Sequence, residues 1–208
     1  MDKKNTEKKI PIYKLTSKEE VLKYYEEWTQ NDQYNKDMVL WNYTAPESAA
    51  KLLNQYTKKK DIKILDAGCG SGLVGESLNK FGYYNIYGVD FSQNMLNLVK
   101  KNIYNNLELV DLNEKLNYRD NFFGAITCVG TFTYGHVKSY VLDEFVRILK
   151  KNGLICFTIN EGIFYEYNFD KKIDELSKRK LWEIIKINKS PYIVNKDVDA
   201  WLCIAKKN

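Results

Sequence analysis

The sequence has little of the chemistry that binds metals. Its 208 residues contain one histidine and four cysteines, and no two cysteines form a C-x-x-C pair. Because protein zinc sites need several Cys or His ligands at short spacing, we predict no metal site. Three of the cysteines lie in apolar runs and one lies among glycines, which is typical of buried thiols in a reducing cytosol. They are Cys69, Cys128, Cys156 and Cys203.

Long apolar runs are also missing. The N-terminal stretch MDKKNTEKKIPIYK has lysines but no apolar segment behind them. A signal peptide needs such a segment, and a membrane helix needs a longer one. We therefore predict no export and no membrane span, a cytoplasmic location, and a flexible, solvated tail over residues 1–17.

The chain lacks a concentrated basic stripe. Its formal net charge is +5, but the lysines are scattered and interleaved with Asp and Glu. Such a pattern is typical of a solvated surface and argues against a nucleic-acid partner. It leaves the oligomeric state open.

Apolar periodicity predicts the class of fold. From Ile62 onward, short β-rich runs alternate with helical segments, which predicts a mostly parallel sheet covered on both faces. Two last strands, joined by a loop with Pro191, predict a closing antiparallel hairpin. The expected class is α/β with a doubly wound sheet of seven strands. We expect strands at 62–66, 85–90, 106–110, 123–129, 153–160, 181–187 and 200–205, and helices at 72–81, 92–101 and 137–150.

The regions outside this alternation hold further helices and a loop. Residues 18–28 and 45–56 have helical spacing, and a loop is expected over residues 30–37. Residues 161–180 form an aromatic loop that leads into a short charged helix. We expect residues 18–208 to form one domain that includes this insert.

The stretch ILDAGCGSG, residues 64–72, places glycines between a strand and a helix. Backbone N–H groups of such a loop approach a ligand where a Cβ atom would clash, at the positive end of a helix dipole. The glycines from Gly70 also match G-x-G-x-x-G, and Asp90 follows at the distance that a dinucleotide site uses. The register argues against that reading, because Gly68 comes first and Leu73 then stands where the third glycine belongs. A P-loop is excluded, since no Gly-Lys-Ser/Thr follows.

The loop and four further stretches resemble a known family. ILDAGCGSG resembles motif I of the class I S-adenosylmethionine-dependent methyltransferases. At the expected intervals follow YGVDFS (87–92), LELVDLNEKL (107–116), FFGAITCVGTFTYGHV (122–137) and LDEFVRILKKNGLICFTI (142–159). The resemblance covers about residues 20–208 and implies a Rossmann-like fold with S-adenosyl-L-methionine as cofactor. YYEEWTQNDQYNKD and TCVGTFTYGHV most resemble the small methyltransferase-like proteins of the Williams–Beuren region type.

The resemblance implies roles for residues at the strand ends. Asp90, followed by Phe91, would accept hydrogen bonds from both ribose hydroxyls; a helix N-cap is the alternative. Asp111 would accept from the adenine amino group, with the Leu112 N–H facing a ring nitrogen; a surface carboxylate is the alternative.

The same resemblance assigns the methionine end of the cofactor. Asp66 would hold the ammonium group through water or the Gly68 backbone, and the carbonyls of Cys128 and Val129 would face it. The loop itself would be shaped by Gly68, Cys69, Gly70 and Gly72.

The resemblance also implies a lid and two candidate catalytic residues. Residues 18–57 would form an N-terminal helical lid, with Tyr25 over the cofactor, although an aromatic stripe at helical spacing is equally typical of plain core. His136 follows the fourth strand as a candidate base, and Tyr134 is a second candidate; local packing is the alternative for both.

Taken together, we expect methyl transfer to a small-molecule acceptor by in-line displacement. An RNA or protein acceptor and a non-catalytic subunit that binds the cofactor are the alternatives. Adenine N6 methylation is disfavoured, because the chain has no Pro-Pro for the loop that this chemistry commonly uses.

Overall fold

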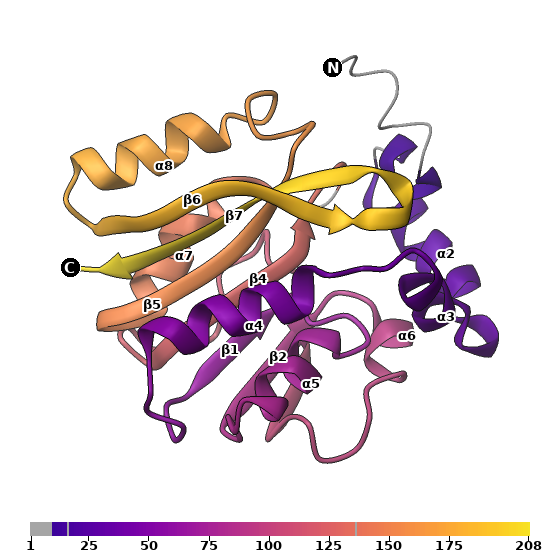
Figure 1. Ribbon diagram of the computed structural model, residues 1–208, viewed down its shortest axis with the longest axis horizontal. Helices are drawn as coiled ribbons and strands as arrows, with labels where there is room; N and C mark the ends of the chain where they lie inside the picture. The colour runs from indigo at the N-terminus through magenta and orange to yellow at the C-terminus, as the bar shows by residue number, and fades with distance from the viewer. Residues whose placement is uncertain (1–9, 16, 136) are drawn as a thin grey trace.

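A computed structural model describes residues 10–15, 17–135 and 137–208. In these residues seven strands form one sheet in the order β3-β2-β1-β4-β5-β7-β6 (Figure 1). The expected α/β fold with a doubly wound, mostly parallel sheet is confirmed. The strands are β1 Ile64–Ala67, β2 Ile86–Asp90, β3 Asn106–Leu109, β4 Phe123–Phe132, β5 Leu149–Asn160, β6 Trp182–Ile193 and β7 Val198–Lys207.

The last two strands form the expected antiparallel hairpin. β7 pairs antiparallel with both β5 and β6, whereas β1 to β5 pair in parallel. The place of Pro191 was predicted wrongly: it lies inside β6, opposite Asp199, and the connection is the 3-10 turn η3, Val194–Lys196. An edge strand tolerates proline because it pairs on one side only.

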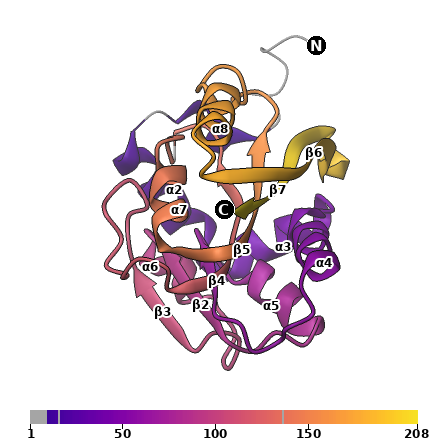
Figure 2. The same cartoon turned by 90° about the vertical axis from the view of Figure 1, so that its left-hand side faces the viewer.

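Helices cover both faces of the sheet (Figure 2). Successive side chains of a strand point to opposite faces, and β5 shows this. The thiol of Cys156 donates to the carbonyl of Ala49 in α4 at 3.6 Å. Phe157, the next residue of β5, points to the other face, where its ring contacts that of Phe132 in β4 with centroids 5.9 Å apart. The Phe132 ring in turn contacts Phe145 of α7 and Phe169 of α8, at centroid distances of 6.5 and 4.8 Å. The covering helices are α4 Ala45–Tyr56, α5 Leu73–Lys80, α7 Val141–Ile148 and α8 Phe169–Lys178.

α5 is one residue shorter at each end than the expected 72–81, and two other helices are much shorter than predicted. α6 covers only Gln93–Leu96 of the expected 92–101, because the next turns are closed by bonds such as Leu98 N–H to the Met95 carbonyl. α7 begins at Val141 and ends at Ile148, where Leu149 turns to extended backbone and pairs with Phe123. β5 therefore begins four residues earlier than expected.

The loop expected over residues 30–37 is instead helical. It contains η2, Gln30–Asp32, and α3, Gln33–Leu40. The polar composition of this stretch led to the prediction of a loop. In the structure, hydrogen bonds to the carboxylate of Asp37 stabilise the helix. It accepts from Trp28 Nε1 at 2.6 Å and from Gln33 Nε2 at 2.8 Å.

Packing reaches further toward the N-terminus than the expected start at residue 18. The 3-10 turn η1, Pro11–Lys14, buries Ile12 and Tyr13. These apolar side chains explain why this part of the expected tail lies on the domain; residues 1–9 are outside the described residues. The predicted α2, Lys18–Trp28, follows with a capping box between Ser17 and Glu20.

Candidate functional site

A pocket lies at the carboxyl ends of β1, β2 and β4. Its volume is about 860 Å³, including open solvent at its mouth. The strand order reverses between β1 and β4, and open α/β sheets bind ligands at such a switch point. Most of the residues expected at the cofactor line this pocket: Tyr25, Gly68, Cys69, Gly70, Asp90, Phe91, Asp111, Leu112 and Val129.

Three expected residues do not line the pocket. Asp66 is fully buried behind the glycine loop, and Cys128 is fully buried within β4. Gly72 has φ 92° and forms the N-cap of α5. Their assigned roles stay predictions.

Gly68 shows why the loop needs glycine. Its φ is 75°, in the left-handed region, and a Cβ atom there would collide with the side chain of Thr131. Thr131 lies in β4, lines the pocket, and its hydroxyl donates to the carbonyl of Ala67 at 3.3 Å. The loop is thus fixed against β4 by the contact between Gly68 and Thr131.

Asp90 lies at the end of β2, directly beside the glycine loop. It is 7% exposed; Oδ2 accepts from the Gly70 N–H and Oδ1 from the Ser92 N–H, both at 2.9 Å. Burial raises the pKa of the carboxyl group to about 6, against the opposing effect of these N–H bonds. The Phe91 N–H also acts on this carboxylate. Because a carboxylate offers about four acceptor positions, capacity remains for a ligand hydroxyl. The ribose of a nucleoside fits this arrangement.

Asp111 lies at the other end of the pocket. Lys18 Nζ, from the first turn of α2, forms an ion pair with Oδ2 at 2.6 Å, and the Asn113 N–H donates to Oδ1 at 2.9 Å. Burial raises the pKa of Asp111, but the hydrogen bonds from Lys18 and Asn113 outweigh it and the pKa is lowered. No pattern in the sequence pointed to Lys18, because the pair joins residues that lie far apart in the chain.

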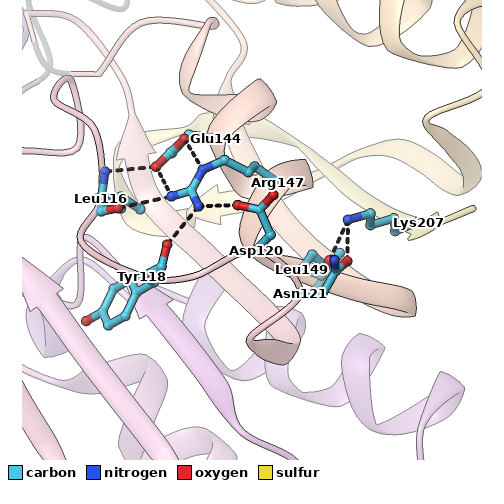
Figure 3. Close-up of polar contacts among 8 residues, drawn as sticks. All are labelled: Leu116, Tyr118, Asp120, Asn121, Glu144, Arg147, Leu149 and Lys207. Carbon is cyan, nitrogen blue, oxygen red and sulfur yellow. Dashed lines mark hydrogen bonds and ion pairs between the residues drawn. The ribbon is translucent and has the colours of Figure 1, made fainter.

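The segment that follows Asp111 and leads to β4 is held by Arg147 of α7 (Figure 3). Its guanidinium donates to the carbonyls of Tyr118 at 2.7 Å and Leu116 at 3.0 Å. It also forms a bidentate pair with Glu144, which in turn accepts from the Leu116 N–H at 2.8 Å. These bonds fix the segment between β3 and β4 against α7.

The N-terminal helices cover the pocket. Tyr25, Tyr34 and Tyr43 line it, and the ring of Tyr25 meets that of Phe91 with centroids 6.1 Å apart. Burial raises the pKa of all three tyrosines, so that they stay neutral near pH 7.

Only some residues of the N-terminal helices contact the pocket or its glycine loop. The hydroxyl of Ser71 in the glycine loop donates to Asn35 Oδ1 of α3 at 2.6 Å. Tyr24 and Trp28 pack against each other at 5.2 Å and do not line the pocket. α4, which also belongs to the expected lid, packs on the sheet with Leu53 fully buried, while Pro46 in its first turn lines the pocket.

The two candidate catalytic residues have different positions. His136 lies outside the described residues. Tyr134 is buried between Tyr13 and Tyr167, with centroids at 5.4 and 6.2 Å, and is not among the residues that line the pocket. Their catalytic roles stay predictions.

Across residues 10–15, 17–135 and 137–208, no three His, Cys, Asp or Glu side chains gather as metal ligands would. All four cysteines are free and buried, as expected. In the same part of the chain, none of the helices combines the length and apolar character that crossing a bilayer requires.

Comparison with known proteins decides the family. Residues 65–157 match the model of a methyltransferase domain. The chain is 30% identical over 169 residues to human methyltransferase-like protein 27, an alignment that covers 78% of this chain and 68% of that protein. The chain belongs to the class I S-adenosylmethionine-dependent methyltransferases. This methyltransferase uses S-adenosyl-L-methionine as its cofactor, and its assignment to the Williams–Beuren subgroup stays a prediction.

Solved structures agree with the fold. A TehB-like methyltransferase from Corynebacterium glutamicum superposes with a TM-score of 0.65 at 21% identity, covering 89% of this chain and 98% of that one. Magnesium protoporphyrin IX methyltransferase from Synechocystis has a TM-score of 0.64 at 15% identity, with 86% of each chain covered.

Proposed function

We propose that this methyltransferase transfers a methyl group to a small-molecule acceptor bound beneath the N-terminal helices. The observation that carries the proposal is the cover over the pocket. Tyr25, Tyr34 and Tyr43 line its upper side, while the Lys18–Asp111 and Ser71–Asn35 contacts tie the helices to the strand ends. A folded polymer would have to displace this cover, whereas a small molecule would not.

Residues of this chain divide the work of holding the cofactor. Asp90 receives the ribose hydroxyls, and Asp111 and the Leu112 N–H receive the adenine ring. The glycine loop and the Val129 carbonyl receive the methionine end. These assignments use positions that line the pocket.

The chemistry requires alignment more than a dedicated catalytic group. The cofactor supplies a methyl group on a sulfonium, which is a good leaving group. The protein has to bring the acceptor atom to about 3–3.5 Å from that methyl group and exclude water. Tyr25, Tyr34 and Tyr43 do this by enclosing the acceptor. An acceptor that is protonated near neutral pH also needs a base, for which we propose His136 or Tyr134.

The name of one structural relative supports a small acceptor. Magnesium protoporphyrin IX methyltransferase is named for a small molecule, and its fold covers most of this chain. The scattered, compensated surface lysines give an RNA acceptor no comparable support.

Transfer of a labelled methyl group tests the proposal. The protein would be incubated with labelled S-adenosyl-L-methionine and a cell extract separated by ultrafiltration into small and large molecules. We expect label in the small-molecule fraction, unaffected by nuclease or protease, and much less label with the Asp90→Asn variant when the cofactor is not saturating. Label confined to the large fraction and released by nuclease or protease would refute the small acceptor and assign RNA or protein instead.

A further inference from the structure

Tyr104 lies just before β3, outside every motif of the family resemblance. Its ring fills the space beside three glycines. A Cβ atom at Gly75 would collide with its hydroxyl end, one at Gly88 would lie 3.0 Å from Cδ1, and one at Gly72 3.4 Å from Cε2. Gly75 therefore makes room for this side chain, and Gly88 makes room for it together with Leu107 and Cys69.

The hydroxyl of Tyr104 joins both ends of the glycine loop. It donates to Asp66 Oδ2 at 2.6 Å and accepts from the Gly75 N–H at 3.2 Å. Asp66 belongs to β1, immediately before the loop, and Gly75 to the first turn of α5, immediately after it. The first N–H groups of a helix have no intrahelical partner, so the tyrosine oxygen satisfies one of them.

We propose that Tyr104 is a positioning residue for cofactor binding, because its hydroxyl sets the distance between the end of β1 and the start of α5. The inference rests on the proposed assignment of the glycine loop to the cofactor. The loop N–H groups point correctly only if both of its anchors are fixed. Thr127 supports the first anchor from β4, since its hydroxyl donates to Asp66 Oδ1 at 2.9 Å.

The charge on Asp66 determines the direction of these bonds. While the carboxyl group is ionised it only accepts, so Tyr104 donates to it and keeps a lone pair for the Gly75 N–H. Burial raises the pKa of Asp66 to about 6, and the hydrogen bonds from Tyr104 and Thr127 oppose that rise. The other titratable groups that act on Asp66 are Asp90, Cys69 and Cys128. Loss of the Tyr104 hydroxyl should therefore raise the pKa of Asp66 further.

Calorimetric titration with S-adenosylhomocysteine across the acid range tests this role. Tyr104→Phe removes a hydrogen bond to a charged group. We therefore expect this variant to bind S-adenosylhomocysteine about three- to tenfold more weakly at neutral pH. Its loss of affinity on acidification should also begin at a higher pH than in the wild-type protein. A residue that only fills space would not move that midpoint, because phenylalanine keeps the ring.

Tyr118→Phe is the matched control, since Tyr118 also donates to a carboxylate, Glu108 at 3.1 Å, away from the glycine loop. It should match the wild type in affinity and midpoint. Thr127→Val removes the other donor to Asp66 and should raise the midpoint as well, which decides the matter if Tyr104→Phe fails to fold. A folded Tyr104→Phe with wild-type affinity and midpoint would overturn the positioning role. Failure of the wild-type protein to bind would instead overturn the loop assignment, and this inference with it.

Discussion

Replacing Asp90 by asparagine should separate cofactor affinity from stability. The proposed ribose bonds change from charge-assisted to neutral, and the amide nitrogen cannot accept a hydroxyl proton at all. With charged bonds contributing about 1.5–3 kcal/mol and neutral ones about 1, we expect a loss of about 2 kcal/mol, or about 30-fold in affinity. Calorimetry with S-adenosylhomocysteine near neutral pH measures this directly.

Two effects on stability should nearly cancel in the same variant. The pKa of Asp90 rises from 3.8 to about 6 in the folded protein. Keeping it ionised at neutral pH therefore costs about 3 kcal/mol, which asparagine relieves. The opposing effect comes from the amide NH₂ of the asparagine, which would face the N–H of Gly70 or Ser92. The buried donor that is then unpaired lowers stability by about 1–3 kcal/mol. Urea unfolding should thus show a small change beside the large loss of affinity.

The pH dependence gives a further check on Asp90. Wild-type affinity should fall as pH drops through about 6, because protonation removes the charge that accepts the hydroxyls. The asparagine variant should show a shallower fall. Affinity equal to the wild type at neutral pH would refute the ribose assignment, whatever the stability of the variant.

Three other substitutions probe the frame around the pocket. Arg147→Ala should lower the free energy of unfolding by about 2 kcal/mol in urea titration, because Glu144 and two carbonyls lose their donor. Gly68→Ala should destabilise the fold by about 1–3 kcal/mol and abolish calorimetric binding, since alanine is strained at φ 75° and meets Thr131. In the wild-type protein, the raised pKa of Asp66 should lower the free energy of unfolding between about pH 5 and pH 7. Asp66→Asn should reduce this loss when urea unfolding is measured at both pH values, because the titrating carboxyl group is gone. An unchanged loss would contradict the burial of the Asp66 charge.

The sequence was informative where local pattern and position in the fold coincide. Asp90 and Asp111 follow short apolar runs at family intervals, and parallel strands bring their carboxyl ends to one edge. Both side chains line the pocket for this reason. The alternation of strands and helices is likewise a local property, which is why the sheet was predicted correctly.

The residues that the sequence missed depend on tertiary contacts. Thr131 packs on Gly68, and Lys18 reaches Asp111 across the pocket. Each pair joins segments that are distant in the chain, and neither residue type has a preferred spacing. Helix α3 was missed for a related reason, since the propensity of its polar residues is overridden by the Trp28–Asp37 bond.

The two buried carboxylates place opposite demands on the molecule. Both Asp66 and Asp90 have folded pKa values near 6, above the usual 3.8, so their ionisation lowers stability as pH rises from about 4 to about 6 and the full cost remains above that. The proposed cofactor contacts of Asp90 and the orientation of Tyr104 need the ionised forms, which exist only above the same pH. Stability and cofactor affinity should therefore change in opposite directions across this range. The hydroxyl and N–H donors around both carboxyl groups limit the rise in their pKa, because they favour the charged forms that burial alone would neutralise. They thereby reduce the stability that ionisation costs.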